Sequence, residues 1–189
     1  MGDLDGSAPL SGRREEEAER PLLMVDIDGV ISLFGTGSGP LGSASAAPPG
    51  ARFHSIEGIP HFLSGTAAAH LLHLAEHFEL VWASGWEERA NDHLPHLLGL
   101  PASMPFLRFD RAVGRSNAHW KLDAIERHAG ARPLAWIDDA LDDECRAWAE
   151  RRGAPTLLVR TDPHVGLGEE EVALLMAWAR ALEEPSTPG

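Results

Sequence analysis

The chain has 189 residues, 43% of them hydrophobic and 24% charged, which is long enough for one globular domain with a sizeable core. With 16 basic and 29 acidic side chains, its formal net charge of −13 argues against extended binding to nucleic acid or to an anionic membrane. A single cysteine, Cys145, excludes an internal disulfide and a cysteine-cluster metal site. Because the apolar runs are too short for a membrane helix and the N-terminus is too polar for a secretory signal, we expect a cytoplasmic protein.

Both ends of the chain are polar and lack a periodic hydrophobic pattern. We expect residues 1–20 and 183–189 to be disordered tails that flank one domain over residues 21–182. Within this domain, short apolar segments alternate with segments of helical period. In chain order, strands are predicted at 22–28, 79–83, 106–109, 134–138 and 156–160, and helices at 65–77, 87–98, 117–128, 141–152 and 169–182.

Apolar strands that alternate with helices of this length are typical of a parallel sheet covered on both faces. We therefore predict an α/β fold, a three-layer α/β/α arrangement around a Rossmann-like parallel sheet. Ligands of such sheets bind beyond the carboxyl ends of the strands. The polar residues that directly follow each predicted strand are therefore the candidates for a functional site.

The first predicted strand ends in two carboxylates, Asp26 and Asp28, and Gly29 permits a tight turn directly after them. Carboxylates placed this close together repel each other unless a cation or hydrogen bonds offset the repulsion. The pair therefore indicates a functional site, and solvated aspartates that cap a turn are the alternative.

Two later strands also end in groups that suit phosphate chemistry. Ser84 and Gly85 offer a hydroxyl and free backbone N–H groups, which suit an oxyanion, although Ser-Gly is also an ordinary turn. Asp138 and Asp139 end the strand at 134–138, and their adjacent carboxylates suggest a hard divalent cation, with magnesium favoured.

Lys121 is the only lysine of the chain and lies in a predicted helix for which Ser116 or Asn117 is the expected N-cap. Its compact ammonium suits a phosphoryl oxygen beside carboxylates, and a solvated helix lysine is the alternative. Asp142 and Asp143 are interpreted as the acidic start of the following helix, where carboxylates are favourable.

The order of these features resembles the four motifs of the haloacid dehalogenase (HAD) superfamily of aspartate-nucleophile phosphohydrolases. The features are a strand followed by Asp-x-Asp-Gly, a strand followed by Ser, a helix with Lys, and a strand followed by Asp-Asp. The resemblance covers residues 22 to about 160, most of the expected domain. The segments 81–86 (VWASGW) and 134–139 (LAWIDD) are more narrowly similar to small bacterial members related to the HAD domain of RNA-repair proteins.

This resemblance implies a magnesium-dependent phosphohydrolase that acts on a phosphomonoester. Asp26 would attack the phosphorus and form an aspartyl-phosphate, and Asp28 would first protonate the leaving oxygen and then activate water. An aspartate at position 28 favours phosphatase over dehalogenase chemistry in this family.

The resemblance also implies two sets of binding residues. The phosphoryl oxygens would be bound by Ser84, Gly85 and Lys121. The Mg²⁺ ion would be held by Asp26, the backbone carbonyl of Asp28 and Asp138, with Asp139 bound through a water molecule or lying just outside the direct ligands.

Members of this superfamily select substrates largely through insertions over the site. Residues 31–64 fill the first insertion point, with a flexible loop expected over 35–51 and a hairpin over 52–63 that turns at Glu57-Gly58. Because the second insertion point has only a short connection, we expect no large cap domain. The open site would admit a phosphorylated small molecule or the end of a macromolecule.

Trp86, Arg89 and Asn91 follow the second motif and are candidates for the rim of the substrate site. Trp86 could stack on a base or a sugar, and packing against the core or against the insertion at residues 31–64, the flap, is the alternative.

Three other functions remain compatible with the motifs. They are a phosphotransferase of the same chemistry, a phosphatase for nucleic-acid ends, and a non-catalytic phosphate-binding interaction module.

Overall fold

A computed structural model describes residues 20–35, 48–110 and 117–184. Ser116, most of the two expected tails and most of the expected flexible loop at 35–51 lie outside these ranges.

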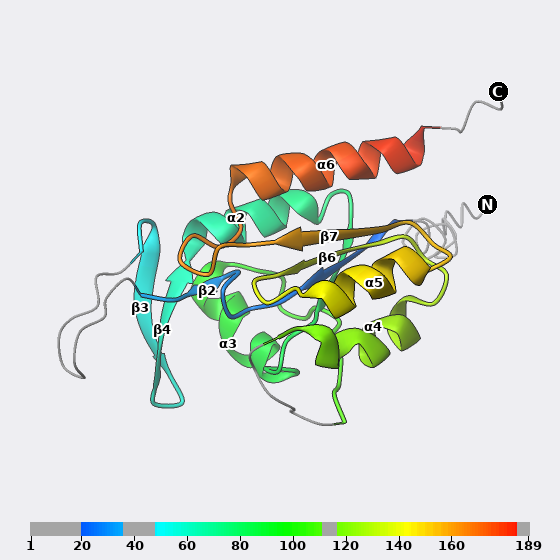
Figure 1. Ribbon diagram of the computed structural model, residues 1–189. Helices are drawn as coiled ribbons and strands as arrows, with labels where there is room; N and C mark the ends of the chain where they lie inside the picture. Colours follow the sequence, from blue (N-terminus) through cyan, green and yellow to red (C-terminus); the bar gives the residue numbers. More distant parts are fainter. Residues whose placement is uncertain (1–19, 36–47, 111–116, 185–189) are drawn as a thin grey trace, which may run out of the picture.

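The described residues form a four-stranded parallel sheet with the strand order β5-β1-β6-β7 (Figure 1). The strands are β1 (Leu22–Val25), β5 (Glu79–Trp82), β6 (Leu134–Asp138) and β7 (Thr156–Arg160). Strand β1 is central, since Val25 lies beside Trp82 on one side and Ile137 on the other. The carboxyl ends of β5, β1 and β6 therefore meet at one edge of the sheet.

The predicted strand at 106–109 is wrong. Phe106 forms only an isolated bridge to Trp82, although the backbone N–H of Leu107 donates to the carbonyl of Trp82 at 2.9 Å. The backbone pairing with β5 stops after this contact. Residues 106–109 therefore lie beside β5 at one point but do not form a further strand of the sheet.

Helices cover both faces of the sheet and complete the predicted three layers. They are α2 (Gly65–Leu74), α3 (Arg89–Leu98), α4 (Leu122–Ala129), α5 (Asp143–Arg151) and α6 (Glu169–Glu183). Successive residues of a strand point to opposite faces. Leu23 and Val25 pack in one core with residues of α2, α3 and α6, and Leu22 and Met24 pack in a second core with residues of α4 and α5. Among the described helices, none has the length and apolar character needed to cross a membrane.

A second, three-stranded antiparallel sheet lies beside the carboxyl end of the parallel sheet (Figure 1). It consists of β2 (Ser32–Leu33), β3 (Ala51–Ile56) and β4 (Ile59–Ser64) in the order β2-β4-β3. Glu57 and Gly58 connect β3 to β4 with positive φ angles of 52° and 81°, as a type I′ turn requires. The hairpin predicted at 52–63 is therefore present, and the described residues contain no large cap domain.

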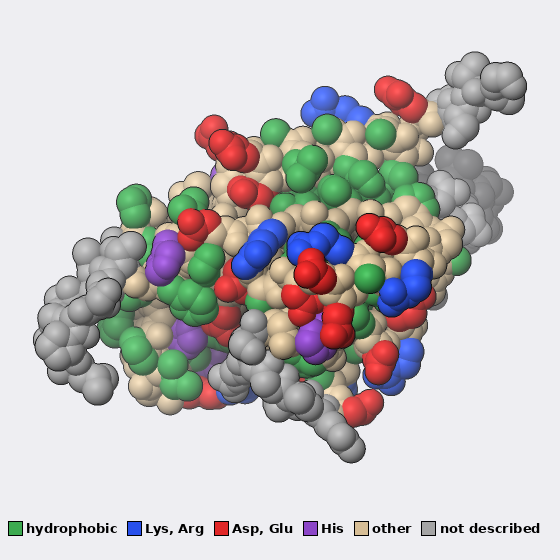
Figure 2. All heavy atoms as spheres, viewed as in Figure 1, with side chains coloured by type: hydrophobic (Ala, Val, Ile, Leu, Met, Phe, Trp, Pro, Cys, Tyr) green, Lys and Arg blue, Asp and Glu red, His purple; other side chains and the backbone are tan. Residues whose placement is uncertain are grey.

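The outer part of this hairpin carries exposed apolar side chains. Figure 2 shows hydrophobic side chains over the region of the hairpin. Phe53 is 61% exposed and its ring meets that of Phe62 edge-on, with centroids 5.9 Å apart.

The helix predicted at 117–128 begins differently from the expectation. A 3₁₀ turn, η1 (His119–Lys121), precedes α4, and neither is capped by a side chain, so Asn117 is not the N-cap. The backbone N–H of Ala118 instead donates to the carbonyl of Ala140 at 3.0 Å, which ties this turn to the loop after β6. This tertiary contact fixes the entry into the helix without a local cap.

Asp142 lies at the start of α5, as interpreted from the sequence, and it caps the helix by accepting a hydrogen bond from the backbone N–H of Cys145 at 3.0 Å. Its other oxygen, Oδ2, lies 2.7 Å from Nδ1 of His119. This hydrogen bond raises the pKa of His119 above its ordinary value, because it favours the protonated ring.

We expect an NMR titration to place the pKa of His119 above about 6.5, the value of a free histidine. Asp142→Asn, which preserves the helix cap, is expected to return that pKa toward 6.5. Because the pKa of His119 is higher in the folded than in the unfolded protein, the hydrogen bond to Asp142 stabilises the fold fully below about pH 6.5. This stabilisation is lost as the pH rises through the folded-state pKa of His119. The difference in melting temperature between wild type and His119→Gln should therefore shrink as the pH increases. A pKa at or below that of free histidine would contradict this account.

Candidate active site

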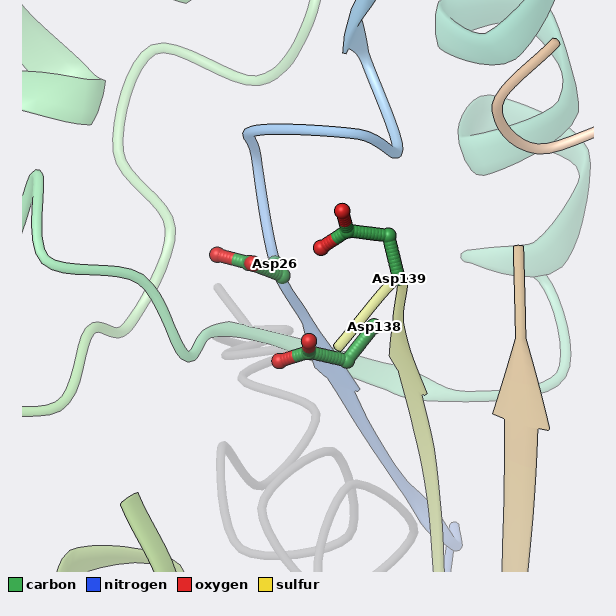
Figure 3. A group of neighbouring side chains, drawn as sticks. All are labelled: Asp26, Asp138 and Asp139. Carbon is green, nitrogen blue, oxygen red and sulfur yellow. The ribbon is translucent and has the colours of Figure 1, made fainter. Parts of the chain in front are cut away.

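Three carboxylates gather at the carboxyl edge of the parallel sheet. Asp26 follows β1, Asp138 ends β6, and Asp139 comes directly after it, so two neighbouring strands supply all three. One oxygen of each side chain lies within 4.8 Å of the others. The three carboxyl groups point to the same side (Figure 3).

Lys121 joins this group from the helical layer that contains η1 and α4. Only 3% of the residue is exposed, and its Nζ lies 3.0 Å from Oδ2 of Asp26 and 2.6 Å from Oδ2 of Asp138. Burial alone would lower the pKa of the ammonium, but the two carboxylates outweigh this effect and raise it. Lys121 is therefore a charged member of the site, and the alternative of a solvated helix lysine is wrong.

Asp138 is completely buried and is held rigidly. Its Oδ1 accepts a hydrogen bond from the backbone N–H of Ala140 at 2.9 Å, and its Oδ2 faces Lys121. Burial and the nearby Asp26 carboxylate raise the pKa of Asp138, although Lys121 opposes the shift. Burial and Asp26 likewise raise the pKa of the Asp139 carboxyl.

The raised pKa values of Asp138 and Asp139 share two causes: burial, which is the larger, and the negative charge of the Asp26 carboxylate. The Asp26 carboxylate raises the pKa of Asp28, Asp138 and Asp139, and the Lys121 ammonium opposes all three shifts. A divalent cation would remove the remaining repulsion, and carboxylate oxygens are the donors that Mg²⁺ prefers. The donor set of Asp26, Asp138 and Asp139 therefore fits a hard divalent cation.

Asp28 lies at the same edge of the sheet, outside this group of three. Its Oδ2 accepts a hydrogen bond from Nε1 of Trp86 at 3.1 Å. Burial and the Asp26 carboxylate raise the pKa of Asp28, against the effects of Trp86, His61 and Lys121. A carboxyl group that takes up a proton more readily than usual suits a general acid.

Gly29 allows the backbone to pass close to Asp139. It has a φ of +75°, and a Cβ added to it would lie 2.4 Å from Cγ of Asp139. Its carbonyl accepts a hydrogen bond from Oγ1 of Thr161 at 2.9 Å, which ties the turn to the end of β7. The glycine after the first motif is therefore required both by the turn and by the neighbouring carboxylate.

Ser84 and Gly85 follow β5 beside the end of β1. Ser84 is 2% exposed, and the preceding Ala83 donates its N–H to the carbonyl of Val25 at 2.8 Å. Glu87, three residues later, has a φ of +50°, which is rare for a residue with a side chain. Its Oε1 accepts a hydrogen bond from the backbone N–H of Phe109 at 2.9 Å, which helps to hold this conformation.

Trp86 packs against the hairpin and is 8% exposed. This packing is the alternative to stacking on a base or a sugar that the sequence left open. Its ring meets the ring of His61 edge-on, with centroids 4.8 Å apart. His61 was not identified from the sequence, because an isolated histidine in a predicted hairpin has no distinctive spacing. Its Nδ1 lies 2.9 Å from Oγ of Ser32, so it links β4 to β2 beside the site.

Asn91 and Arg89 make contacts within the fold. Oδ1 of Asn91 accepts hydrogen bonds from Nε1 of Trp82 and the backbone N–H of Met104, at 3.2 and 3.1 Å, and its Nδ2 donates to the Met104 carbonyl. These bonds connect Asn91 to β5 and to Met104, and its place at the rim of the substrate site stays a prediction. Arg89 is exposed and forms an ion pair of 3.0 Å with Glu57 at the hairpin turn.

Comparison with known protein families identifies the same region. The sequence model of a family described as "HAD domain in Swiss Army Knife RNA repair proteins" matches residues 22–172. The matched region begins at β1 and ends within α6, so it contains every motif residue of the site. A search of curated proteins finds no match.

The close approach of Gly29 to Asp139 can be tested by Gly29→Ala, with Gly58→Ala as the control. Gly58 also has a positive φ, of +81°, but an added Cβ there would meet nothing within 4 Å. Gly58→Ala should cost about 1 kcal/mol for its backbone conformation alone. Gly29→Ala should cost about 1–3 kcal/mol more, because Asp139 must also move. Equal free energies of unfolding for the two variants in urea would show that this contact is not tight.

Proposed function

Since the chain belongs to the family of HAD domains in Swiss Army Knife RNA repair proteins, we propose that it is a magnesium-dependent phosphatase with an aspartyl-phosphate intermediate. Membership of this family supports a HAD-type phosphohydrolase in general. The observation that carries the finer proposal is the buried Lys121 ammonium, which contacts Asp26 and Asp138 within a cluster of carboxylates.

In the proposed first step, a carboxylate oxygen of Asp26 forms a bond to the phosphorus of the substrate. The bond from phosphorus to the leaving oxygen breaks, and its electron pair stays on that oxygen. The carboxyl group of Asp28 gives its proton to the same oxygen, so the product leaves as a neutral alcohol. The raised pKa of Asp28 supports this role, because the group must be protonated when the bond breaks.

In the proposed second step, water releases the phosphate. The Asp28 carboxylate accepts a proton from the water as its oxygen bonds to phosphorus, and the bond between phosphorus and Asp26 breaks. Asp26 recovers its carboxylate and Asp28 its proton. The net reaction converts a phosphomonoester and water into an alcohol and inorganic phosphate.

Other residues of the site would hold the phosphoryl group in position for both steps. The Lys121 ammonium, the Ser84 hydroxyl and the Gly85 N–H would donate hydrogen bonds to its oxygens. Burial of Lys121 and Ser84 supports this assignment, because donors in a water-poor site interact more strongly with a charged group.

Mg²⁺ would be held by Asp26, Asp138 and Asp139, whose carboxylates converge, and by the backbone carbonyl of Asp28. When bound, it would reduce the repulsion between the anionic phosphate and these carboxylates.

A phosphorylated end of RNA is the first substrate class to test. The description of the family refers to RNA repair, and the described residues include no large cap that would exclude a polymer end. Acidic and basic side chains are interspersed on the face shown in Figure 2, and this supports contacts to a short end over contacts along a duplex. The same open site would also admit small phosphomonoesters.

Release of phosphate from an aryl phosphate should require both Mg²⁺ and Asp26. We expect Asp26→Asn to lower kcat at least about 10³-fold, because the nucleophile is lost. Asp123→Asn, which changes an exposed carboxylate on α4, should leave kcat unchanged. Wild-type protein that releases no phosphate from a panel of aryl phosphates, nucleotides and phosphorylated RNA ends would refute the proposal.

Binding of Mg²⁺ should also be visible without turnover, as a rise in melting temperature with increasing Mg²⁺ concentration. Asp139→Asn should need an at least about tenfold higher Mg²⁺ concentration for the same rise in melting temperature, because a ligand is weakened. Asp123→Asn is again the control. Identical titrations for wild type and Asp139→Asn would remove Asp139 from the metal site.

A further inference from the structure

Asp28, the proposed general acid, is held in place by one other side chain. Among the hydrogen bonds of the described residues, its carboxyl group has a single side-chain partner, Nε1 of Trp86, at 3.1 Å from Oδ2. An indole N–H can only donate, so this contact fixes which oxygen of Asp28 faces the tryptophan. No side chain of the described residues donates a hydrogen bond to the other oxygen, Oδ1.

Trp86 is itself held from two directions. Its ring packs edge-on against His61, which is linked to Ser32 by a hydrogen bond of 2.9 Å. Its carbonyl accepts a hydrogen bond from the backbone N–H of Arg89 at 3.1 Å, at the start of α3. The contact with His61 and the low exposure of 8% restrict rotation of the indole away from Asp28.

The chain after Trp86 adopts a strained conformation that contributes to this placement. Glu87 has a φ of +50°, in a region that costs a residue with a side chain about 1–2 kcal/mol. Two hydrogen bonds hold it there, from its own N–H to the Ser84 carbonyl at 3.0 Å and from the Phe109 N–H to its side chain at 2.9 Å. Strain that is held in this way beside an active site indicates a functional requirement.

We propose that Trp86 is a positioning residue for the acid–base step: its N–H holds Oδ2 of Asp28 so that Oδ1 exchanges the proton with the leaving oxygen and then with water. This inference rests on the proposed phosphatase function. The hairpin contributes to this positioning, because His61 of β4 packs against Trp86. A segment of the flap therefore helps to position the general acid.

Direct binding of substrate by the indole is the competing role, and two observations argue against it. Trp86 is only 8% exposed, so its ring offers little area for stacking on a base or a sugar. Its single polar hydrogen is already donated to Asp28.

The experiment measures kcat/KM for a series of aryl phosphates in wild type and in Trp86→Phe. This ratio reports the steps up to departure of the leaving group. Phenoxide needs a proton in order to leave, whereas 2,4-dinitrophenoxide does not. We expect Trp86→Phe to lower kcat/KM about 10–100-fold for phenyl phosphate and less than about threefold for 2,4-dinitrophenyl phosphate, as misplacement of a general acid predicts.

Trp148→Phe is the matched control. Trp148 is 9% exposed, and its Nε1 donates to a carboxylate oxygen of Glu126 at 3.0 Å, away from the site. Trp148→Phe removes the same kind of hydrogen bond from a similarly buried indole. This variant should therefore lower stability without changing how kcat/KM depends on the leaving group. If Trp86→Phe does not fold, benzothienylalanine at position 86 replaces only the N–H and keeps the shape of the ring.

A double variant tests whether Trp86 acts through Asp28. In the background of Asp28→Asn, Trp86→Phe should have no further effect on kcat/KM, because the proton donor is already absent. Three outcomes would each overturn the inference. Trp86→Phe could lower kcat/KM equally for both aryl phosphates, or it could behave like Trp148→Phe. It could also lower kcat/KM as much in the Asp28→Asn background as in wild type. If wild type is inactive, or if Asp26→Asn is as active as wild type, the proposed function itself fails and the inference fails with it.

Discussion

The buried ion pairs of Lys121 with Asp26 and Asp138 are the interaction on which the rest of the site depends. They join η1 to the ends of β1 and β6, so they connect a helical layer to the two central strands of the sheet. Removal of one partner from such a buried pair typically costs about 3–5 kcal/mol, because the other charge is left uncompensated. The geometry of the carboxylates is therefore coupled to the packing of the domain.

A second set of contacts connects the hairpin to this edge of the sheet. Trp86 bonds to Asp28 and packs against His61, and Arg89 forms an ion pair with Glu57 at the hairpin turn. Exposed ion pairs contribute little to stability, so the buried indole is the stronger connection. The insertion after the first motif thus contributes side chains that support the site, although it forms no large cap among the described residues.

Much of the fold could be predicted from the sequence, because the signals were local. The strands at 134–138 and 156–160 have the predicted bounds, and the hairpin turns at Glu57-Gly58 as expected. Errors arose where tertiary contacts replaced local ones. The segment at 106–109 was apolar enough for a strand but pairs through only one bridge, and the entry into α4 is tied to the loop after β6 without a side-chain cap.

The fold class and the order of the motif residues could be predicted from the amino-acid sequence, because hydrophobic period and the polarity of strand ends are local properties of the chain. It also identified Lys121 as unusual, but the alternative of a solvated lysine was excluded only by its burial between Asp26 and Asp138. The bond between Trp86 and Asp28 joins residues 58 positions apart, and no pattern of spacing predicts it. Such contacts are visible only in the folded protein, since they depend on how the hairpin and the helical layers pack against the edge of the sheet.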